Sequence, residues 1–200
     1  MTKETPPERR PGRSVDMGPA PGRGRPGKVE MSRALVVYES MWGNSERVAR
    51  AVAAGVREVM GVEVVEVGSA PTDLTDTELV VAGGPTHAFS MSRASTRRDA
   101  RGQGAPLGSV ASGLREWLDA LGHEHGRWLA AFDTRVTKVR HLPGSAAHSA
   151  ARAGRRHGFT DAVHPESFFV LAVDGPLAEG ELERARRWGH DVAASLPARV

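Results

Sequence analysis

Short apolar segments and amphipathic segments alternate along the chain from residue 33 to residue 196. Five short apolar runs, rich in β-branched residues, predict strands that are covered on both faces. They span residues 34–38, 62–67, 78–83, 128–132 and 168–173. Apolar residues at helical spacing predict helices over residues 45–60, 110–121, 145–157 and 182–196.

Strands that alternate with helices are joined by right-handed crossovers and form a parallel sheet with helices on both faces. For one domain of this length the common strand order is 2-1-3-4-5. The pattern therefore predicts an α/β fold, a three-layer doubly wound five-stranded parallel sheet. Trp117, Trp128 and Trp188 lie on the apolar stripes and are predicted to be core residues.

Residues 1–30 differ in composition from the rest of the 200-residue chain. They hold six of the 13 prolines, five of the 23 glycines and almost no large apolar side chains. Such a segment buries too little surface to offset its chain entropy, so we predict a disordered basic tail followed by one domain at residues 31–200. Two interpretations of the tail stay open. It is either a passive extension, including a start assigned upstream of Met31, or an Arg/Gly arm that contacts nucleic acid or a partner.

Charge argues against nucleic-acid binding by the domain itself. Residues 1–30 carry seven Lys and Arg and four Asp and Glu, which accounts for the whole formal net charge of +3. Residues 31–200 are therefore neutral and have no global positive field to attract phosphate backbones.

No apolar run is long enough to span a membrane, and no signal peptide is evident. A cytoplasmic location is the default expectation. The absence of cysteine excludes disulfides, zinc–thiolate sites and thiol nucleophiles.

Two loops rich in small and hydroxyl residues follow the first and third predicted strands, at residues 39–45 and 84–92. In the predicted strand order ligands bind in the crevice between these strand ends. The first loop opens a helix, where free N–H groups and the helix dipole favour an anion. Serine, asparagine and glycine also cap helices routinely, so capping alone is an equally open explanation of this loop.

The segment Val36-Val37-Tyr38-Glu39-Ser40-Met41-Trp42-Gly43-Asn44-Ser45 resembles the phosphate-binding signature of the flavodoxin family. The segment Val81-Ala82-Gly83-Gly84-Pro85-Thr86-His87-Ala88-Phe89-Ser90 resembles the flavodoxin loop that lies against the flavin ring. The resemblance implies a flavodoxin-like fold and bound flavin mononucleotide (FMN). By this resemblance the phosphate would be held by Ser40, Met41, Trp42, Gly43, Asn44 and Ser45. The ring and ribityl chain would be lined by Pro85, Thr86, His87, Ala88 and Phe89.

The third loop departs from the family pattern. Flavodoxins usually offer a tyrosine and a Gly-Asp pair there, whereas the sequence from Phe132 reads Asp133, Thr134, Arg135 and then more basic residues. We include Asp133, Thr134 and Arg135 in the candidate cofactor site. If its charges face the flavin, a basic loop stabilises the anionic reduced form and raises the potential. A solvated loop with its charges turned away is equally open.

Other candidate groups are weaker. Arg93, Arg97, Arg98 and Arg101 lie in a long polar connection over residues 93–108, which we interpret as a mobile, hydrated loop, with grip on a ligand or partner as the alternative. His123 and His125 lack a third ligand at recognisable spacing, so no metal site is expected. No residue stands out as an acid–base catalyst.

Other functions that this strand order can support require sequence motifs that this chain lacks. The sequence contains no P-loop, no phosphorylatable Asp at the end of the third strand, no cysteine nucleophile and no three-glycine dinucleotide motif. Two hypotheses remain. One is an FMN-binding redox protein, either an electron carrier or a small reductase, with an unidentified redox partner or small-molecule acceptor. The other is a flavodoxin-like binding or regulatory module that has lost FMN or binds another phosphorylated ligand.

Overall fold

The computed structural model describes Met1 and residues 33–197 of the chain. The predicted tail at residues 1–30 lies outside the described residues. Within residues 33–197 the strands are β1 (Arg33–Tyr38), β2 (Gly61–Glu66), β3 (Leu79–Pro85), β4 (Trp128–Val136), β5 (Thr160–Asp161) and β6 (Glu166–Val170). The helices are α1 (Asn44–Val56), α2 (Ala94–Gly102), α3 (Leu114–Asp119), α4 (Ala146–Arg156) and α5 (Glu181–Ala194), with 3-10 turns η1 (Val67–Ser69) and η2 (Thr137–Val139). None of these helices is both long and apolar enough to cross a membrane.

The strands form one parallel sheet in the order β2-β1-β3-β4-β5, with β6 also paired to β4. This confirms the predicted α/β fold and the 2-1-3-4-5 order. Two pieces pair with the far side of β4. β6 corresponds to the predicted fifth strand and pairs with the end of β4, whereas β5, which pairs with its beginning, was not predicted. Pro165 lies between the two pieces, and proline cannot donate a hydrogen bond to a strand ladder.

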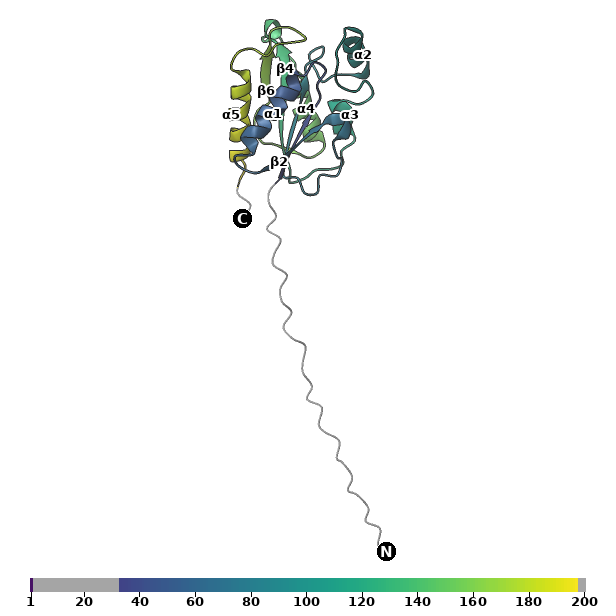
Figure 1. Cartoon of the computed structure of the whole chain (residues 1–200), viewed down its shortest axis with the longest axis vertical. Helices are drawn as coiled ribbons and strands as arrows, with labels where there is room; N and C mark the ends of the chain where they lie inside the picture. Colours follow the sequence, from purple (N-terminus) through teal and green to yellow (C-terminus); the bar gives the residue numbers. More distant parts are fainter. Residues whose placement is uncertain (2–32, 198–200) are drawn as a thin grey trace. The chain divides into compact units, whose positions relative to one another are not determined.

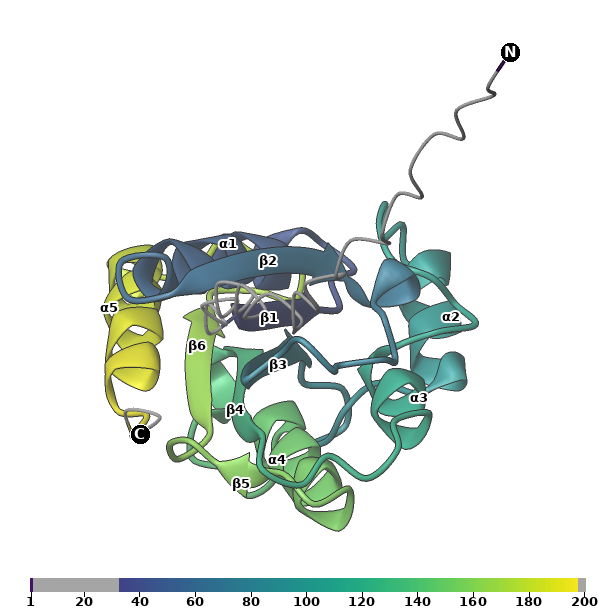
Figure 2. The same cartoon turned by 90° about the horizontal axis from the view of Figure 1, so that it is seen from below.

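Helices cover both faces of the sheet, as Figure 2 shows, with α1 and α5 on one side and α3 and α4 on the other. Side chains along each central strand alternate between two buried clusters. Leu35 and Val37 of β1 point to the α3 and α4 side, whereas Val36 points to the α1 and α5 side. The predicted core tryptophans follow this division, with Trp117 buried on the first side and Trp188 packed on the second.

Helices α1 and α5 cross at two glycines, which allow their backbones to touch. A Cβ added at Gly55 would lie 1.9 Å from the carbonyl oxygen of Arg186, and one at Gly189 would lie 2.1 Å from that of Val52. No side chain fits at either place. This close crossing fixes α1, and with it the loop at the start of α1, against the C-terminal helix.

Two predicted boundaries are wrong, and both concern buried polar residues. Strand β4 continues through Asp133, Thr134 and Arg135, which were predicted to form a loop. Residues 94–102 form helix α2 inside the predicted polar loop, and Figure 1 shows α2 at one edge of the domain. The buried positions of α2 are Arg97 and Ala100, so no apolar stripe marked it as a helix.

We predict that Gly55→Ala lowers the free energy of unfolding by about 2–3 kcal/mol, since the added methyl group overpacks the crossing of α1 and α5. Chemical denaturation measures the change. The matched control is Gly102→Ala, at which an added Cβ meets nothing within 4 Å. The control is expected to be neutral or stabilising by up to about 1 kcal/mol, because alanine is the better helix former. Equal effects of the two variants would contradict the close crossing.

Candidate cofactor-binding site

A cleft opens at the end of the sheet where β1, β3 and β4 finish, and the space inside it that a water-sized sphere can reach is about 80 Å³. Because these strands are parallel, the segments that follow them begin at the same end of the sheet. The cleft is lined by Ser40, Met41, Trp42, Asn44, Ser45, Pro85, Thr86, His87, Thr134, Arg135, Val136, Val170 and Val173.

The cleft brings together most of the residues that the sequence predicted for a cofactor site. The predicted residues outside its lining are Gly43, Ala88, Phe89 and Asp133. The lining residues that the sequence did not predict are Val136, Val170 and Val173. These valines continue strand β4 or follow from β6, and an apolar residue carries no sequence signal that separates a cleft wall from a core position.

The loop between β1 and α1 combines the N-terminus of α1 with a pair of hydroxyls. Gly43 has a φ of +86°, the left-handed region that favours glycine, and its N–H donates to Ser40 Oγ at 3.1 Å. The amides of the first turn of α1 have no acceptor within the helix. Ser45 Oγ lies 2.7 Å from Thr134 Oγ1, so hydroxyls from α1 and β4 meet in the cleft. The arrangement suits an anion held by dipoles.

Asn44 is engaged with the segment that follows β6. Its Nδ2 donates to the carbonyl oxygen of Asp174 at 3.1 Å, across 130 positions in sequence. Gly175 packs directly against this amide, at a φ of +108°, and a Cβ there would lie 2.8 Å from Asn44 Nδ2. Asn44 therefore ties the wall formed by residues 171–180 to the start of α1, and its amide nitrogen already has a protein partner.

Met41 and Trp42 connect the first loop to α2. Met41 is buried in a small cluster with Ala100 and Ala105, and Trp42 packs half-buried against that cluster. The N–H of Leu107 donates to the carbonyl oxygen of Met41 at 3.1 Å. Trp42 thus borders both the cleft and the segment after α2.

The loop after β3 makes a tight turn with a strained backbone. His87 and Ser90 exchange two backbone hydrogen bonds, of 2.9 and 3.1 Å, around Ala88 and Phe89. Ala88 has a φ of +46° and Phe89 a φ of +63°, where each non-glycine residue costs about 1–2 kcal/mol. The turn leaves Phe89 49% exposed. Strain of this kind concentrates at functional sites.

The His87 imidazole is a neutral lining group. Burial lowers the pKa of His87, and the positive charge of Arg97 lowers it further. The ring is therefore uncharged at neutral pH and presents a flat surface to the cleft.

Asp133 and Arg135, at the end of β4, are both buried but differ in their partners. Asp133 Oδ2 accepts a hydrogen bond from the N–H of Ala147 at 3.0 Å, so this carboxyl caps α4 rather than lining the cleft. Arg135 is 7% exposed, and its guanidinium donates to the carbonyl oxygens of Val139 at 2.5 Å and Leu142 at 3.1 Å. Its Nε is buried without a partner. Other atoms of Arg135 contribute to the lining of the cleft.

A buried network of charged groups lies behind the first loop. Glu39 accepts hydrogen bonds from Ser92 Oγ at 2.5 Å and from the N–H of Leu114 at 2.8 Å. Burial raises the pKa of Glu39, while these two bonds and the charge of Arg97 act in the opposite direction. Glu39 was not among the predicted site residues, although its position directly after an apolar strand is a sequence signal for it.

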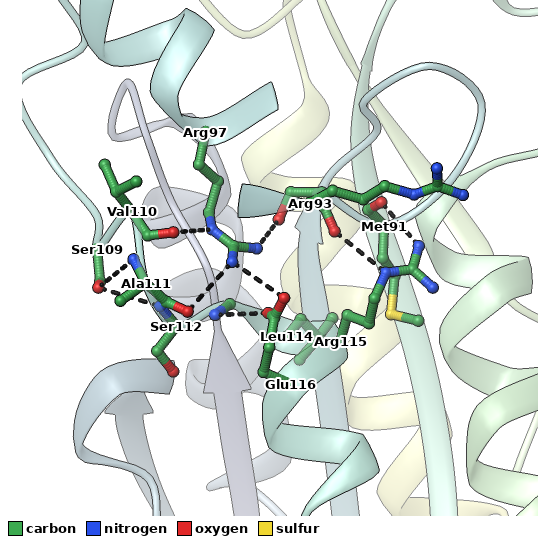
Figure 3. A network of polar contacts seen from close by, with 12 residues as sticks. Met91, Arg93, Arg97, Ser109, Val110, Ala111, Ser112, Leu114, Arg115 and Glu116 are labelled. Atoms are coloured by element: carbon green, nitrogen blue, oxygen red, sulfur yellow. Dashed lines mark hydrogen bonds and ion pairs between the residues drawn. The ribbon is translucent and has the colours of Figure 1, made fainter. Parts of the chain in front are cut away.

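Arg97 is the centre of this network and is fully buried. Figure 3 shows its guanidinium between α2 and the start of α3, where it donates to the carbonyl oxygen of Val110 at 3.0 Å and pairs with Glu116 at 3.1 Å. It also donates to Ser92 Oγ at 2.8 Å. The prediction that this arginine is mobile and hydrated is therefore wrong. Arg93 and Arg98 are exposed, and Arg98 lies within helix α2 rather than in a loop.

Within residues 33–197, no three His, Asp or Glu side chains gather in a way that would hold a metal ion. The rings of His123 and His125 stack on each other with their centroids 5.6 Å apart.

Comparison with solved structures identifies the fold, while no protein-family model matches the sequence. Flavodoxin 1 from Bacillus cereus is similar with a TM-score of 0.61 and 16% identity, over 83% of this chain and 100% of that one. Flavodoxin 2 from Bacillus cereus gives a TM-score of 0.60 and 18% identity, over 82% and 100%. A flavodoxin from the domain Archaea gives 0.56 and 20% identity, over 81% and 96%.

These similarities establish that the chain has a flavodoxin-like fold. At identities of 20% or less they establish the fold alone, and a fold hosts many functions. The function has to be argued from the cleft.

We predict that Arg97→Met lowers the free energy of unfolding by about 3–5 kcal/mol, because it removes the positive partner of two carboxylates and leaves Glu39 buried without it. The matched control is Arg98→Met, the next residue, which is exposed; a change within about 0.5 kcal/mol is expected there. Urea denaturation measures both. A loss of less than 1 kcal/mol for Arg97→Met would mean that the network is not a structural tie.

The loss in Arg97→Met should increase with pH. A carboxyl whose pKa is higher in the folded than in the unfolded state destabilises the fold as pH rises from the lower to the higher value. The pKa of Glu39 is already raised, and the loss of Arg97 raises it further. We expect a larger destabilisation at pH 8 than at pH 5. A loss that is independent of pH would assign the effect to packing instead.

We predict that Ala88→Gly stabilises the protein by about 1 kcal/mol, because it removes the backbone strain of an exposed residue with positive φ. The control is the same substitution at Ala54, in the interior of α1, which should destabilise by about 1 kcal/mol. Thermal unfolding at fixed pH measures both. Destabilisation by both variants would contradict the left-handed turn.

Proposed function

We propose that the chain binds FMN in the cleft and acts as a redox protein, either as an electron carrier or as a small FMN-dependent reductase. The flavodoxin-like fold supports the proposal at the level of architecture. The observation that carries it is local. The start of α1, whose first-turn amides have no acceptor within the helix, and the Ser45–Thr134 hydroxyl pair line the same cleft.

The phosphate end of the proposed site is built from dipoles. Helix N-terminal amides favour an anion without a neighbouring cation, and hydroxyls add donors. Gly43 leaves room for a close approach, because its nearest side-chain neighbour, Leu107, lies 3.8 Å from where a Cβ would be.

The ring end needs flat, apolar cover, which aromatic side chains provide by stacking. Trp42 and the uncharged His87 line the cleft from two different loops. Phe89 lies at the tip of the turn that follows His87. Bound FMN would supply the electron-transfer chemistry, and these side chains would orient it and keep water from its faces.

A second candidate is a binding module for another phosphorylated ligand. It is favoured by the composition of the first loop, in which Met41 and Trp42 offer no hydroxyl and Asn44 already donates to Asp174. A shorter ligand would need the phosphate end of the cleft and not the aromatic side chains.

Titration of the purified protein with FMN tests the proposal. We expect a shift of the flavin absorption band and a change in flavin fluorescence with a one-to-one endpoint. Riboflavin, which lacks the phosphate, should bind at least about tenfold more weakly, since hydrogen bonds to a charged group contribute about 1.5–3 kcal/mol each. No binding at tens of micromolar FMN would favour the second candidate.

The variant Ser45→Ala tests whether the phosphate of FMN binds next to this hydroxyl. Loss of this hydroxyl should weaken FMN binding about tenfold and leave riboflavin binding unchanged. Ser195→Ala, beyond the far end of α5, is the control and should change neither. An equal effect of Ser45→Ala on both flavins would show that the phosphate lies elsewhere. Bleaching of the bound flavin by NADH or NADPH then separates a reductase from a carrier.

A further inference from the structure

Exposed large apolar side chains gather around the mouth of the cleft. Within residues 33–197 there are six, and only Val59 lies at the opposite end, after α1. The other five, which we call the apolar rim, are Phe89, Leu107, Leu142, Leu171 and Val173. They are 40–63% exposed. Single exposed apolar residues are ordinary, but five at one end mark an interaction surface.

The members of the apolar rim come from four segments that contact one another or the cleft. Leu107 is bonded through its N–H to the first loop, and Val173 lines the cleft. The turn that carries Phe89 lies against Gly144, just after Leu142, because a Cβ at Gly144 would be 3.1 Å from Phe89 Cβ. The apolar rim therefore borders the cleft on several sides.

The side of the mouth formed by Phe89 and Leu142 is basic. The two segments that build it, residues 79–98 and 134–160, contain no Asp or Glu. Near the mouth they expose Arg93, Lys138 and Arg140, and in the described part of the chain no carboxylate pairs with these three side chains. Residues 31–200 are neutral as a whole, so this cluster is a local positive field.

We propose that an acidic electron-transfer protein docks on the apolar rim, with its carboxylates against Arg93, Lys138 and Arg140. The redox role of this partner rests on the proposed function, because docking at the mouth brings a partner next to a cofactor in the cleft. The charge complementarity rests on the residues alone. An apolar centre with a charged border gives contact area and steers encounter, and it makes association depend on salt.

The test measures binding of the full chain to an acidic [2Fe–2S] ferredoxin, with basic cytochrome c and duplex DNA as alternative probes. Binding of ferredoxin alone, weakening about tenfold between 20 and 200 mM salt, supports the proposal. Preference for cytochrome c overturns it. Equal or tighter binding of DNA also overturns it, since the surface would then attract polyanions in general.

Two variants locate the surface. Lys138→Glu with Arg140→Glu should weaken ferredoxin binding at least about tenfold. Arg9→Glu with Arg10→Glu makes the same change of charge in the basic N-terminal segment and should have less than a twofold effect. Loss of binding in this second variant instead would assign the attraction to residues 1–30 and overturn the proposal. Leu142→Ser should weaken binding equally at low and high salt.

Measurement with and without FMN separates this proposal from the proposed function. Ferredoxin binding to the chain without flavin, together with a failed FMN titration, would retain the surface and overturn its redox role. FMN binding without ferredoxin binding would retain the cofactor site and overturn the docking surface.

Discussion

Parallel pairing of the three central strands determines where the site can form. Tyr38, Gly83 and Phe132 are paired across β1, β3 and β4, and beyond this level β3 continues to Pro85 and β4 to Val136. The pairing of β3 with β4 also requires a glycine. A Cβ added at Gly83 would lie 2.1 Å from the ring of Phe132, so no side chain fits there. A shift in register would turn buried side chains to the wrong face and separate Ser45 from Thr134. The position of the first loop relative to the part of the cleft formed by β4 therefore depends on the register of these strands.

A network of buried charged residues stabilises the first loop. A fully buried guanidinium is tolerated only when its donors are bonded, and Arg97 meets this condition with two backbone carbonyls, a serine and a carboxylate. Through Ser92, the network reaches Glu39, the residue that joins β1 to the first loop. The ion pair of Arg97 with Glu116 also joins α2 to α3. Around Arg97, hydrogen bonds and an ion pair stabilise the structure, whereas apolar packing stabilises it around the sheet.

The sequence predicted the fold because its signals are periodic and apolar. Alternating strands and helices give the sheet order, and the two hydroxyl-rich loops indicate the correct end of the sheet. The sequence did not predict three features that depend on buried polar residues or on distant partners. Helix α2 buries an arginine, β4 ends in buried polar residues, and the partner of Asn44 is 130 positions away. Each depends on a tertiary partner, which a hydrophobic pattern does not contain.

The bond between Asn44 and the carbonyl oxygen of Asp174 has a consequence for how the molecule is made. A chain emerging from the ribosome presents β1 and the first loop early, but the wall that faces them is encoded in the last 30 residues. Strand β6 and residues 171–180 must leave the ribosome before the cleft is enclosed. During synthesis the N-terminal half can gain secondary structure without gaining a binding site. A ligand of the cleft would therefore bind only after β6 and residues 171–180 have been synthesised.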